Sequence, residues 1–418
     1  MIDRIEFTAH HLTSNAGLLL LLENTRKNGI FDWIDKELVF GNRSTDQIKM
    51  NHIQTLLCGN FLGIDKLERL KLLQGDPLVR EYAISVKEPE TVFRFLGNFS
   101  YKTTQMLREV NFRLFRILLL RSKHKAITID IDSSVVNVEG HQEGTARGYN
   151  PKKLGSPCYN LQFAFCDEIK AFVTGYVRSG DTYTANGTAG LIQEIIAQIQ
   201  GLRVKPIFRM DSGYFDETIL ETIESLGCTY VIKAKGYPTL VSMASEPGLT
   251  FIPGENGLET AELVVALDSW KRARRFIVER VRKDATRTAQ LSFLSGEEFE
   301  YFFFVTNTDL PAEAVVSFYE KRGNAENYIK EAKYDLAVGH LLLRSFWANE
   351  AIFQLTMMAY DLFLLFKMDR GLKAEYRQQI KTFRLKYIFL AGRIIRTARQ
   401  VVLKLPGQYA YQPIFDHF

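Results

Sequence analysis

Acidic residues stand at the ends of two runs of sequence that are typical of β-strands. Asp130 and Asp132 lie two apart in residues 126–132, so on a strand their side chains point to the same face. Asp211 directly follows residues 204–210, a second strand-like run. Open α/β sheets bind ligands at the carboxyl ends of their strands, and carboxylates gathered there are hard oxygen ligands suited to Mg²⁺ or Mn²⁺. Taken alone, Asp211 fits equally well as a turn residue that caps the helix after it.

A third acidic residue belongs to a polar pattern on the helix that the sequence predicts from about residue 312 to 334. Tyr319, Arg322, Glu326 and Lys333 follow one another at steps of three, four and seven residues. These steps return to the same face of a helix, so the four side chains form one polar stripe. A solvated helix surface, with Arg322 paired to Glu326 at i, i+4, would show the same pattern.

This stripe resembles the Y-R-E-K signature of insertion-sequence transposases of the D-D-E type, in which the glutamate completes a metal site. The resemblance extends to residues 132–134 (Asp-Ser-Ser), where small hydroxyl residues follow the first aspartate, and to residues 211–215 (Asp-Ser-Gly-Tyr-Phe), where aromatic residues follow the second. Residues 147–153 (Arg-Gly-Tyr-Asn-Pro-Lys-Lys) are also similar to what these transposases carry after the first aspartate. The resemblance covers roughly residues 126–340, and residues 1–125 show no matching motif.

The resemblance implies a catalytic site in which Asp132, Asp211 and Glu326 hold two Mg²⁺ ions, with Mn²⁺ as a substitute. Two metal ions about 3.5 to 4 Å apart promote in-line displacement at phosphorus by activating the attacking oxygen and stabilising the leaving oxygen. Asp130 is the rival of Asp132 for the first position, because both point to the same strand face. The small hydroxyl residues that follow Asp132 favour Asp132.

Basic and aromatic residues near these motifs are the candidates for contact with DNA. The resemblance implies that Arg322 and Lys333 contact phosphates near the scissile bond, and that Tyr319 packs against or hydrogen-bonds the backbone there. The segment after the first aspartate adds Arg147, Lys152 and Lys153 to these candidates.

Trp270 stands in a basic stretch that contains Lys271, Arg272, Arg274 and Arg275. An aromatic ring in such a place could stack on a base while its neighbours contact phosphates. The resemblance to hairpin-forming transposases, which stack a flipped base on a Trp of an insertion domain, favours this role. A tryptophan packed in the core explains the position equally well.

The resemblance implies a DNA transposase of a bacterial insertion sequence that cuts and joins strands in cut-and-paste transposition. Its partners would be double-stranded DNA, as terminal inverted repeats and target DNA, and a second copy of the chain in a homodimer on DNA. One alternative is a domesticated DNA-binding protein without the reaction, although all three acids are present. Another is a metal-dependent phosphatase, because residues 130–133 (Asp-Ile-Asp-Ser) resemble the D-x-D motif of haloacid-dehalogenase-like phosphatases. The paired acidic motif that this second family carries downstream is not found.

The elements that must position these residues form an α/β protein. Apolar residues at helical spacing predict a helical N-terminal domain for DNA binding or dimerisation over residues 1–125. Strand-like runs followed by helices predict an α/β core over residues 126–235, for which the resemblance implies a ribonuclease H-like fold. The remaining predicted segments are a β-rich insertion at 236–305, a core helix with the catalytic Glu at 306–345, and a basic helical C-terminal region at 346–418 with helices at 347–366 and 376–405.

Composition and charge narrow the class of protein. The chain has 418 residues, of which 46% are hydrophobic and 24% charged, a balance typical of soluble globular proteins. The net charge of +5 is mild, but residues 367–404 hold eleven Lys or Arg against two acidic residues. This basic segment could bind along the phosphate backbone of DNA. Neither the four Cys nor the seven His have metal-ligand spacing. The sequence contains no phosphate-binding P-loop, so we expect no nucleotide cofactor. The apolar residues 355–366 are too few to span a bilayer, so we expect a buried helix, no membrane partner and a cytoplasmic location.

Overall fold

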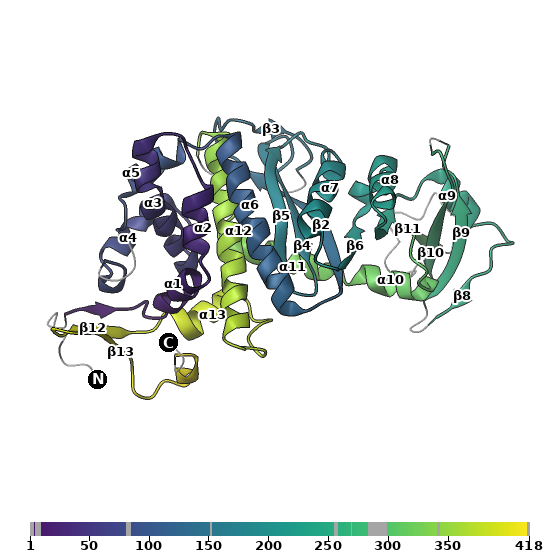
Figure 1. The fold of residues 1–418 in the computed structure, drawn as a ribbon. Coiled ribbons are helices and arrows are strands. Elements are labelled where there is room, and N and C mark those ends of the chain that lie inside the picture. Colours follow the sequence, from purple (N-terminus) through teal and green to yellow (C-terminus); the bar gives the residue numbers. More distant parts are fainter. Residues whose placement is uncertain are drawn as a thin grey trace.

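The computed structural model describes residues 4, 10–80, 85–150, 153–254, 258–268, 270–282, 299–340 and 343–415. A helical bundle, a large mixed sheet and a β-rich end follow one another along the molecule (Figure 1). The bundle is formed by α1 (Leu18–Lys27), α2 (Ile30–Glu37), α3 (Arg43–Leu62), α4 (Lys71–Gln74), α5 (Pro89–Leu96) and α6 (Tyr101–Ser122). The N-terminal part is therefore helical as predicted, apart from the short strand β1 (Leu12–Thr13).

Ten described strands form the main sheet. They are β2 (Ala126–Asn137), β3 (Ala146–Arg147), β4 (Pro157–Cys166), β5 (Ala171–Ser179), β6 (Lys205–Met210), β7 (Thr229–Ala234), β8 (Ile252–Pro253), β9 (Glu259–Val265), β10 (Arg274–Arg282) and β11 (Phe299–Thr306). Their order is β3-β4-β2-β6-β7-β11-β10-β9-β8, with β5 also paired to β4. β2 runs antiparallel to β4 and parallel to β6, and β6 runs parallel to β7. The helices α7 (Thr188–Ile199) and α8 (Glu217–Ser225) connect β5 to β6 and β6 to β7.

The β-rich stretch predicted at residues 236–305 does not form a sheet of its own. It begins with a helix, α9 (Pro238–Ala244), and its strand β11 pairs antiparallel with β7. β10 and β9 then continue the same sheet outward. The predicted core and the predicted insertion therefore share one continuous sheet.

The long helix α12 (Phe346–Asp369) lies beside α6, between the bundle and the sheet (Figure 1). Among the described helices it alone is long and apolar enough to cross a membrane, but 89% of its apolar window is buried inside the protein. It is thus the buried helix that the sequence predicts.

Polar side chains of α12 satisfy the backbone of strand β5, which pairs only with β4 among the described strands. Asp361 Oδ1 accepts from Phe172 N at 2.9 Å, and Glu350 Oε2 accepts from Val177 N at 2.7 Å. Gln354 Nε2 donates to the carbonyl oxygen of Gly175 at 2.8 Å. Because an edge strand otherwise exposes unpaired backbone groups, these contacts close that edge of the sheet.

Glu350→Gln should make the protein less sensitive to alkaline pH. Burial raises the pKa of Glu350 to about 7. In the unfolded chain this carboxyl has a pKa of about 4.3, so between about pH 4.3 and pH 7 it binds fewer protons in the unfolded chain than in the folded chain. The folding stability therefore falls as the pH rises through this range and stays lower above it. Glutamine carries no charge at any of these pH values, so its burial does not become less favourable as the pH rises. Relative to the native protein, the variant's free energy of unfolding should therefore rise by roughly 1 to 3 kcal/mol between pH 5 and pH 8.

Urea denaturation at the two pH values measures this gain. The exposed Glu246 offers the matched control Glu246→Gln, which should show no pH-dependent gain. An equal pH dependence in Glu350→Gln and the native protein would contradict the prediction.

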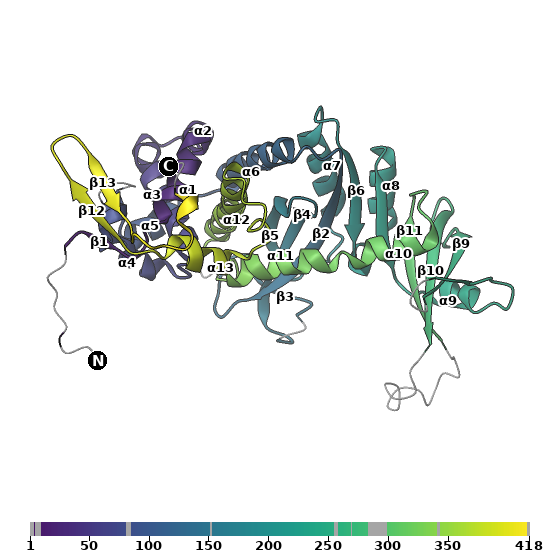
Figure 2. The same ribbon diagram turned by 90° about the horizontal axis from the view of Figure 1, so that it is seen from below.

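The predicted helix over residues 312–334 is broken into α10 (Ala312–Glu320) and α11 (Gly323–Tyr334). At the junction Arg322 N donates to Tyr319 O at 2.8 Å and Ala325 N to Arg322 O at 2.9 Å, so bonds between residues three apart replace the regular α-helical pattern. Gly323, a poor helix former, lies at this break. The prediction of one helix was wrong here, although the two pieces remain nearly in line along the sheet (Figure 2).

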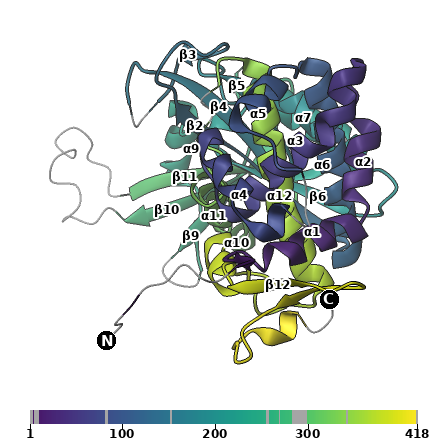
Figure 3. The same cartoon turned by 90° about the vertical axis from the view of Figure 1, so that its left-hand side faces the viewer.

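The predicted helix over residues 376–405 was also wrong. The chain forms only a short helix, α13 (Ile380–Phe383), and a π-helical turn, and then a hairpin of β12 (Gly392–Arg396) and β13 (Val401–Lys404). β-branched residues such as Ile394, Ile395 and Val401 favour strands. β12 also pairs with β1, so a three-stranded sheet lies at the lower edge of the helical bundle (Figure 3).

Candidate active site

Asp132 and Asp211 are brought together by the parallel pairing of β2 and β6. In this register Asp130 pairs with Arg209 and Ile131 with Met210, so Asp132 and Asp211 are the next residues in line at the carboxyl end of β6. Burial, together with Asp211, raises the pKa of Asp132 to about 6 against the opposing effect of Arg322. The two aspartates therefore share one electrostatic environment.

Arg322 joins Glu326 to this pair. Its Nη1 donates to Asp132 Oδ2 and its Nη2 donates to Glu326 Oε1, each at 2.9 Å. The Asp132 side chain is 15% exposed and that of Glu326 is 46% exposed, so the group opens to solvent on the α11 side. The neighbouring acids raise the pKa of Arg322, although its burial opposes this, so its guanidinium remains charged.

Asp211 also has the structural role that the sequence allowed. Its Oδ1 accepts from Gly213 N at 2.8 Å and caps the turn Ser212–Tyr214. One carboxylate oxygen is engaged in this way, so the cap and a place beside Asp132 are compatible.

The three carboxylates fit Mg²⁺ in kind, because hard oxygen donors are what this ion prefers. Within the described ranges, however, no three His, Cys, Asp or Glu side chains are grouped so that they could hold a metal ion. The guanidinium of Arg322 lies between Asp132 and Glu326 and pairs with both. An ion shared by these two acids would have to compete with Arg322.

Arg322→Ala should therefore increase the affinity of the DNA-free protein for Mn²⁺. Removing a positive charge in contact with two carboxylates should strengthen cation binding by roughly ten-fold or more. Electron paramagnetic resonance of free Mn²⁺ measures the affinity, with Arg147→Ala as the control because Arg147 is exposed on β3. An unchanged affinity in Arg322→Ala would show that Arg322 does not compete with the ion.

Asp130 occupies a different environment from Asp132. Its two carboxylate oxygens accept from Arg209, Oδ1 from Nε at 2.7 Å and Oδ2 from Nη2 at 2.8 Å, and its side chain is only 1% exposed. Burial raises the pKa of Asp130 and the Arg209 guanidinium opposes that rise. A buried, ion-paired Asp130 is also ill-suited to be the nucleophile that the phosphatase alternative requires.

The remaining residues of the predicted stripe are divided between two helices. Tyr319 lies in the last turn of α10 and packs against the ring of Phe304, with centroids 4.9 Å apart, and burial raises its pKa to about 12. Lys333 lies in the last turn of α11, and its Nζ donates to Ser134 Oγ at 2.8 Å and to Val135 O at 3.0 Å. Lys333 thus ties α11 to β2 just beyond Asp132.

Trp270 is packed against other aromatic rings. Its centroid lies 5.2 Å from that of Phe215 and 5.9 Å from that of Phe276, and the Arg274 guanidinium lies 4.8 Å from it. The basic neighbours are paired with acids: Lys271 with Glu221, Arg272 and Arg274 with Glu224, and Arg275 with Glu262. This arrangement favours core packing of Trp270 over an open stacking platform.

In the segment after the first aspartate, Arg147, Tyr149 and Lys153 are exposed. Arg147 lies on β3, and Lys153 pairs with Glu139 at 3.3 Å. The buried Asn150 anchors the turn, because its Nδ2 donates to Asn137 Oδ1 at 2.6 Å. Tyr149, which the sequence did not single out, is 83% exposed, and Lys152 lies outside the described residues.

Two residues that form an ionic cluster with Asp130, next to the site, were missed. Arg209 is fully buried on β6, and Asp167 follows β4 and pairs with it at 2.9 Å. The signal for Arg209 was a charged residue inside an apolar strand, two positions before Asp211 and therefore on the same face.

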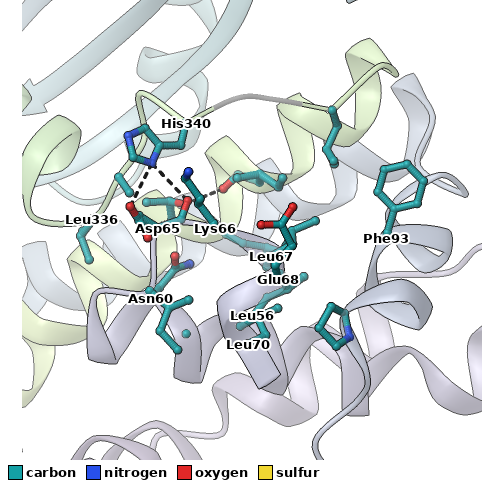
Figure 4. A pocket seen from close by; sticks show the side chains of 18 of the residues that line it. Leu56, Asn60, Asp65, Lys66, Leu67, Glu68, Leu70, Phe93, Leu336 and His340 are labelled. Atoms are coloured by element: carbon teal, nitrogen blue, oxygen red, sulfur yellow. Dashed lines mark hydrogen bonds and ion pairs between the residues drawn. The ribbon is translucent and has the colours of Figure 1, made fainter. Parts of the chain in front are cut away.

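A separate cavity of about 590 Å³ lies between α3, α5 and the residues that follow α11 (Figure 4). Its wall is largely apolar, with Leu56, Leu70 and Phe93, and His340 stands at one side, within 3.2 Å of the carbonyl oxygen of Asp65. No residue that the sequence assigns to the acid site lines it.

The fold and the site define an α/β protein with acidic residues from two parallel inner strands of the sheet and from one helix beside them. The family model described as transposase DDE domain group 1 matches residues 4–418, so the chain belongs to this transposase family. No curated protein matches the chain. Among solved structures, a piggyBac transposase synaptic complex with hairpin DNA is similar at 11% sequence identity and a TM-score of 0.44, covering 88% of this chain and 82% of that one.

Proposed function

We propose that this protein is the DNA transposase of a bacterial insertion sequence, which cleaves and joins strands at the transposon ends in cut-and-paste transposition. The observation that carries this proposal is that Arg322 bonds both Asp132 and Glu326 while Asp211 lies next in line to Asp132, in a chain of the DDE transposase family.

The strand order supports a ribonuclease H-like core. In the order β5-β4-β2-β6-β7, β5, β4 and β2 pair in antiparallel fashion, and β6 and β7 are parallel to β2. The helices α7 and α8 provide the crossovers that parallel strands require. In this arrangement the central strand carries the first acid and the next strand carries the second.

Asp132, Asp211 and Glu326 would hold two Mg²⁺ or Mn²⁺ ions. When bound, such ions activate the attacking oxygen and stabilise the leaving oxygen at phosphorus. Arg322 is placed to bind a phosphate next to the acids, since a guanidinium pairs with phosphate as it does with carboxylate. Lys333, through Ser134 and Val135, holds the end of β2 in place.

The DNA would be double-stranded, with terminal inverted repeats and target DNA bound by a homodimer in the cytoplasm. The exposed Arg147, Tyr149 and Lys153 supply basic and aromatic groups beyond the end of β2. The hairpin β12–β13 supplies a second basic surface, with exposed Arg393, Arg396, Arg399 and Lys404. Contacts of this kind fix a protein on the phosphate backbone without reading sequence.

Incubation with end-labelled DNA that carries the element's own ends tests this proposal, with scrambled ends as the control. We expect cleavage at the ends with Mg²⁺ or Mn²⁺ and none with a chelator. Binding of the ends without cleavage under any divalent ion would favour the domesticated DNA-binding protein instead.

A further inference from the structure

A buried ionic cluster lies next to the acid site, two residues earlier on β2 and β6. Arg209 Nε and Nη2 donate to Asp130, and Nη2 also donates to Asp167 Oδ2 at 2.9 Å. The Arg209 side chain has no exposed surface, and its charge is balanced by the two aspartates. Because Asp130 and Arg209 are register partners two residues before Asp132 and Asp211, the cluster and the acids occupy successive positions on one face of the sheet.

The same cluster reaches both helices that carry the Y-R-E-K residues. Arg209 Nη1 donates to the carbonyl oxygen of Phe318 at 2.7 Å, and its guanidinium lies 5.0 Å from the centroid of the Phe318 ring. Phe318 stands in the last turn of α10. On α11, the Tyr328 hydroxyl donates to Asp167 Oδ1 at 3.0 Å, and Asn324 Nδ2 lies 3.5 Å from the same oxygen.

The contacts of Asp167 determine which face of α11 points at the sheet. Asn324 and Tyr328 are four residues apart and share a face. Residues two positions apart on a helix differ by about 200° in direction, so Glu326 lies on the other flank of α11 from Tyr328, with the buried face of the helix between them. Arg322 shares that side with Glu326 and contacts Asp132.

We propose that Asp130, Arg209 and Asp167 form a positioning cluster that sets the rotation of α11 and thereby holds Arg322 and Glu326 opposite Asp132. This inference rests on the proposed function for its effect on catalysis. The cluster acts through the backbone of Phe318 and the hydroxyl of Tyr328. A misplacement of about 1 Å in a catalytic group can lower a rate by about 100-fold, so a cluster that fixes one helix rotation matters to the reaction.

Tyr328→Phe and Asp167→Asn test the cluster without emptying the core. Tyr328→Phe removes only the hydroxyl that reaches Asp167, and Asp167→Asn keeps the size of a side chain that is 16% exposed while removing its charge. Tyr376→Phe is the matched control, because its hydroxyl donates to the carbonyl oxygen of Ile169 in the same β4–β5 connection but does not touch the cluster.

Three measurements on each variant separate positioning from folding: the melting temperature, the affinity for end DNA, and the single-turnover cleavage rate. We expect cleavage to slow by about ten-fold in Tyr328→Phe and by about 30-fold or more in Asp167→Asn, with end affinity and melting temperature close to those of Tyr376→Phe. If both variants cleave as fast as Tyr376→Phe, the cluster does not position the site.

Mn²⁺ affinity of the DNA-free protein gives a readout that is independent of cleavage. A rotated α11 withdraws the Arg322 guanidinium that competes with a cation at Asp132, so both variants should increase the Mn²⁺ affinity by at least about three-fold while Tyr376→Phe leaves it unchanged. If the native protein cleaves no DNA, the proposed function fails, and the Mn²⁺ result alone then decides for or against the cluster.

Discussion

Alanine at Asp132, Asp211 or Glu326 will lower the rate of end cleavage by at least about 1,000-fold and leave the affinity for the ends within about three-fold. The three acids meet through Arg322 and through the pairing of β2 with β6. Under the proposed function, removing any one would take away oxygen donors for the ions that promote the reaction, whereas basic residues would still contact the DNA backbone. Single-turnover cleavage and a gel-shift titration measure the two effects.

Glu320→Ala is the matched control for these three substitutions. Glu320 is an exposed acid at the end of α10, close in sequence to Arg322, and it has no described contact with Asp132 or Asp211. It should cleave at the native rate. A native rate in Asp132→Ala, or an equal loss in Glu320→Ala, would contradict the assignment of the three acids.

Arg209→Met will lower the free energy of unfolding by about 3 to 5 kcal/mol. The substitution leaves Asp130 buried at 1% exposure without the guanidinium that binds both of its oxygens. An unpaired buried charge is far more costly than a lost surface pair. Urea denaturation measures the change.

Arg69→Met is the control, since Arg69 pairs with Asp65 on the surface and its side chain is 54% exposed. It should cost less than about 1 kcal/mol. Combining Arg209→Met with Asp130→Leu should recover part of the stability, because the buried charge is removed with its partner. A cost for Arg209→Met as small as that for Arg69→Met would show that the buried pair does not stabilise the fold.

The apolar runs before Asp132 and Asp211 correctly predicted strands, but the strand end predicted at Asp132 was wrong, because β2 continues to Asn137. Which strands pair depends on contacts far apart along the chain, so the continuation of the sheet from β7 into β11 was not visible. The same reason explains the C-terminal error. β12 is stabilised by pairing with β1 near the N-terminus, and helical spacing of apolar residues alone did not reveal it.

Spacing along the chain identified Arg322 and Glu326, because side chains four residues apart meet on a helix. The two residues pair even though Arg322 is the N-cap residue of α11, just before the helix begins. It could not show that Arg322 also contacts Asp132, 190 residues away. The distinction between Asp130 and Asp132 likewise depends on Arg209, which bonds Asp130 and which the sequence analysis did not identify.

Metal specificity of cysteine variants tests the central claim, that Asp132 belongs to a metal-dependent DNA cleavage site. Thiolate is a softer ligand than carboxylate and binds Mn²⁺ better than Mg²⁺. Asp132→Cys should be inactive on end DNA with Mg²⁺ and recover part of the cleavage with Mn²⁺, while Glu320→Cys cleaves with either ion. Full activity of Asp132→Cys with Mg²⁺, or the same switch in Asp130→Cys and not in Asp132→Cys, would contradict the account.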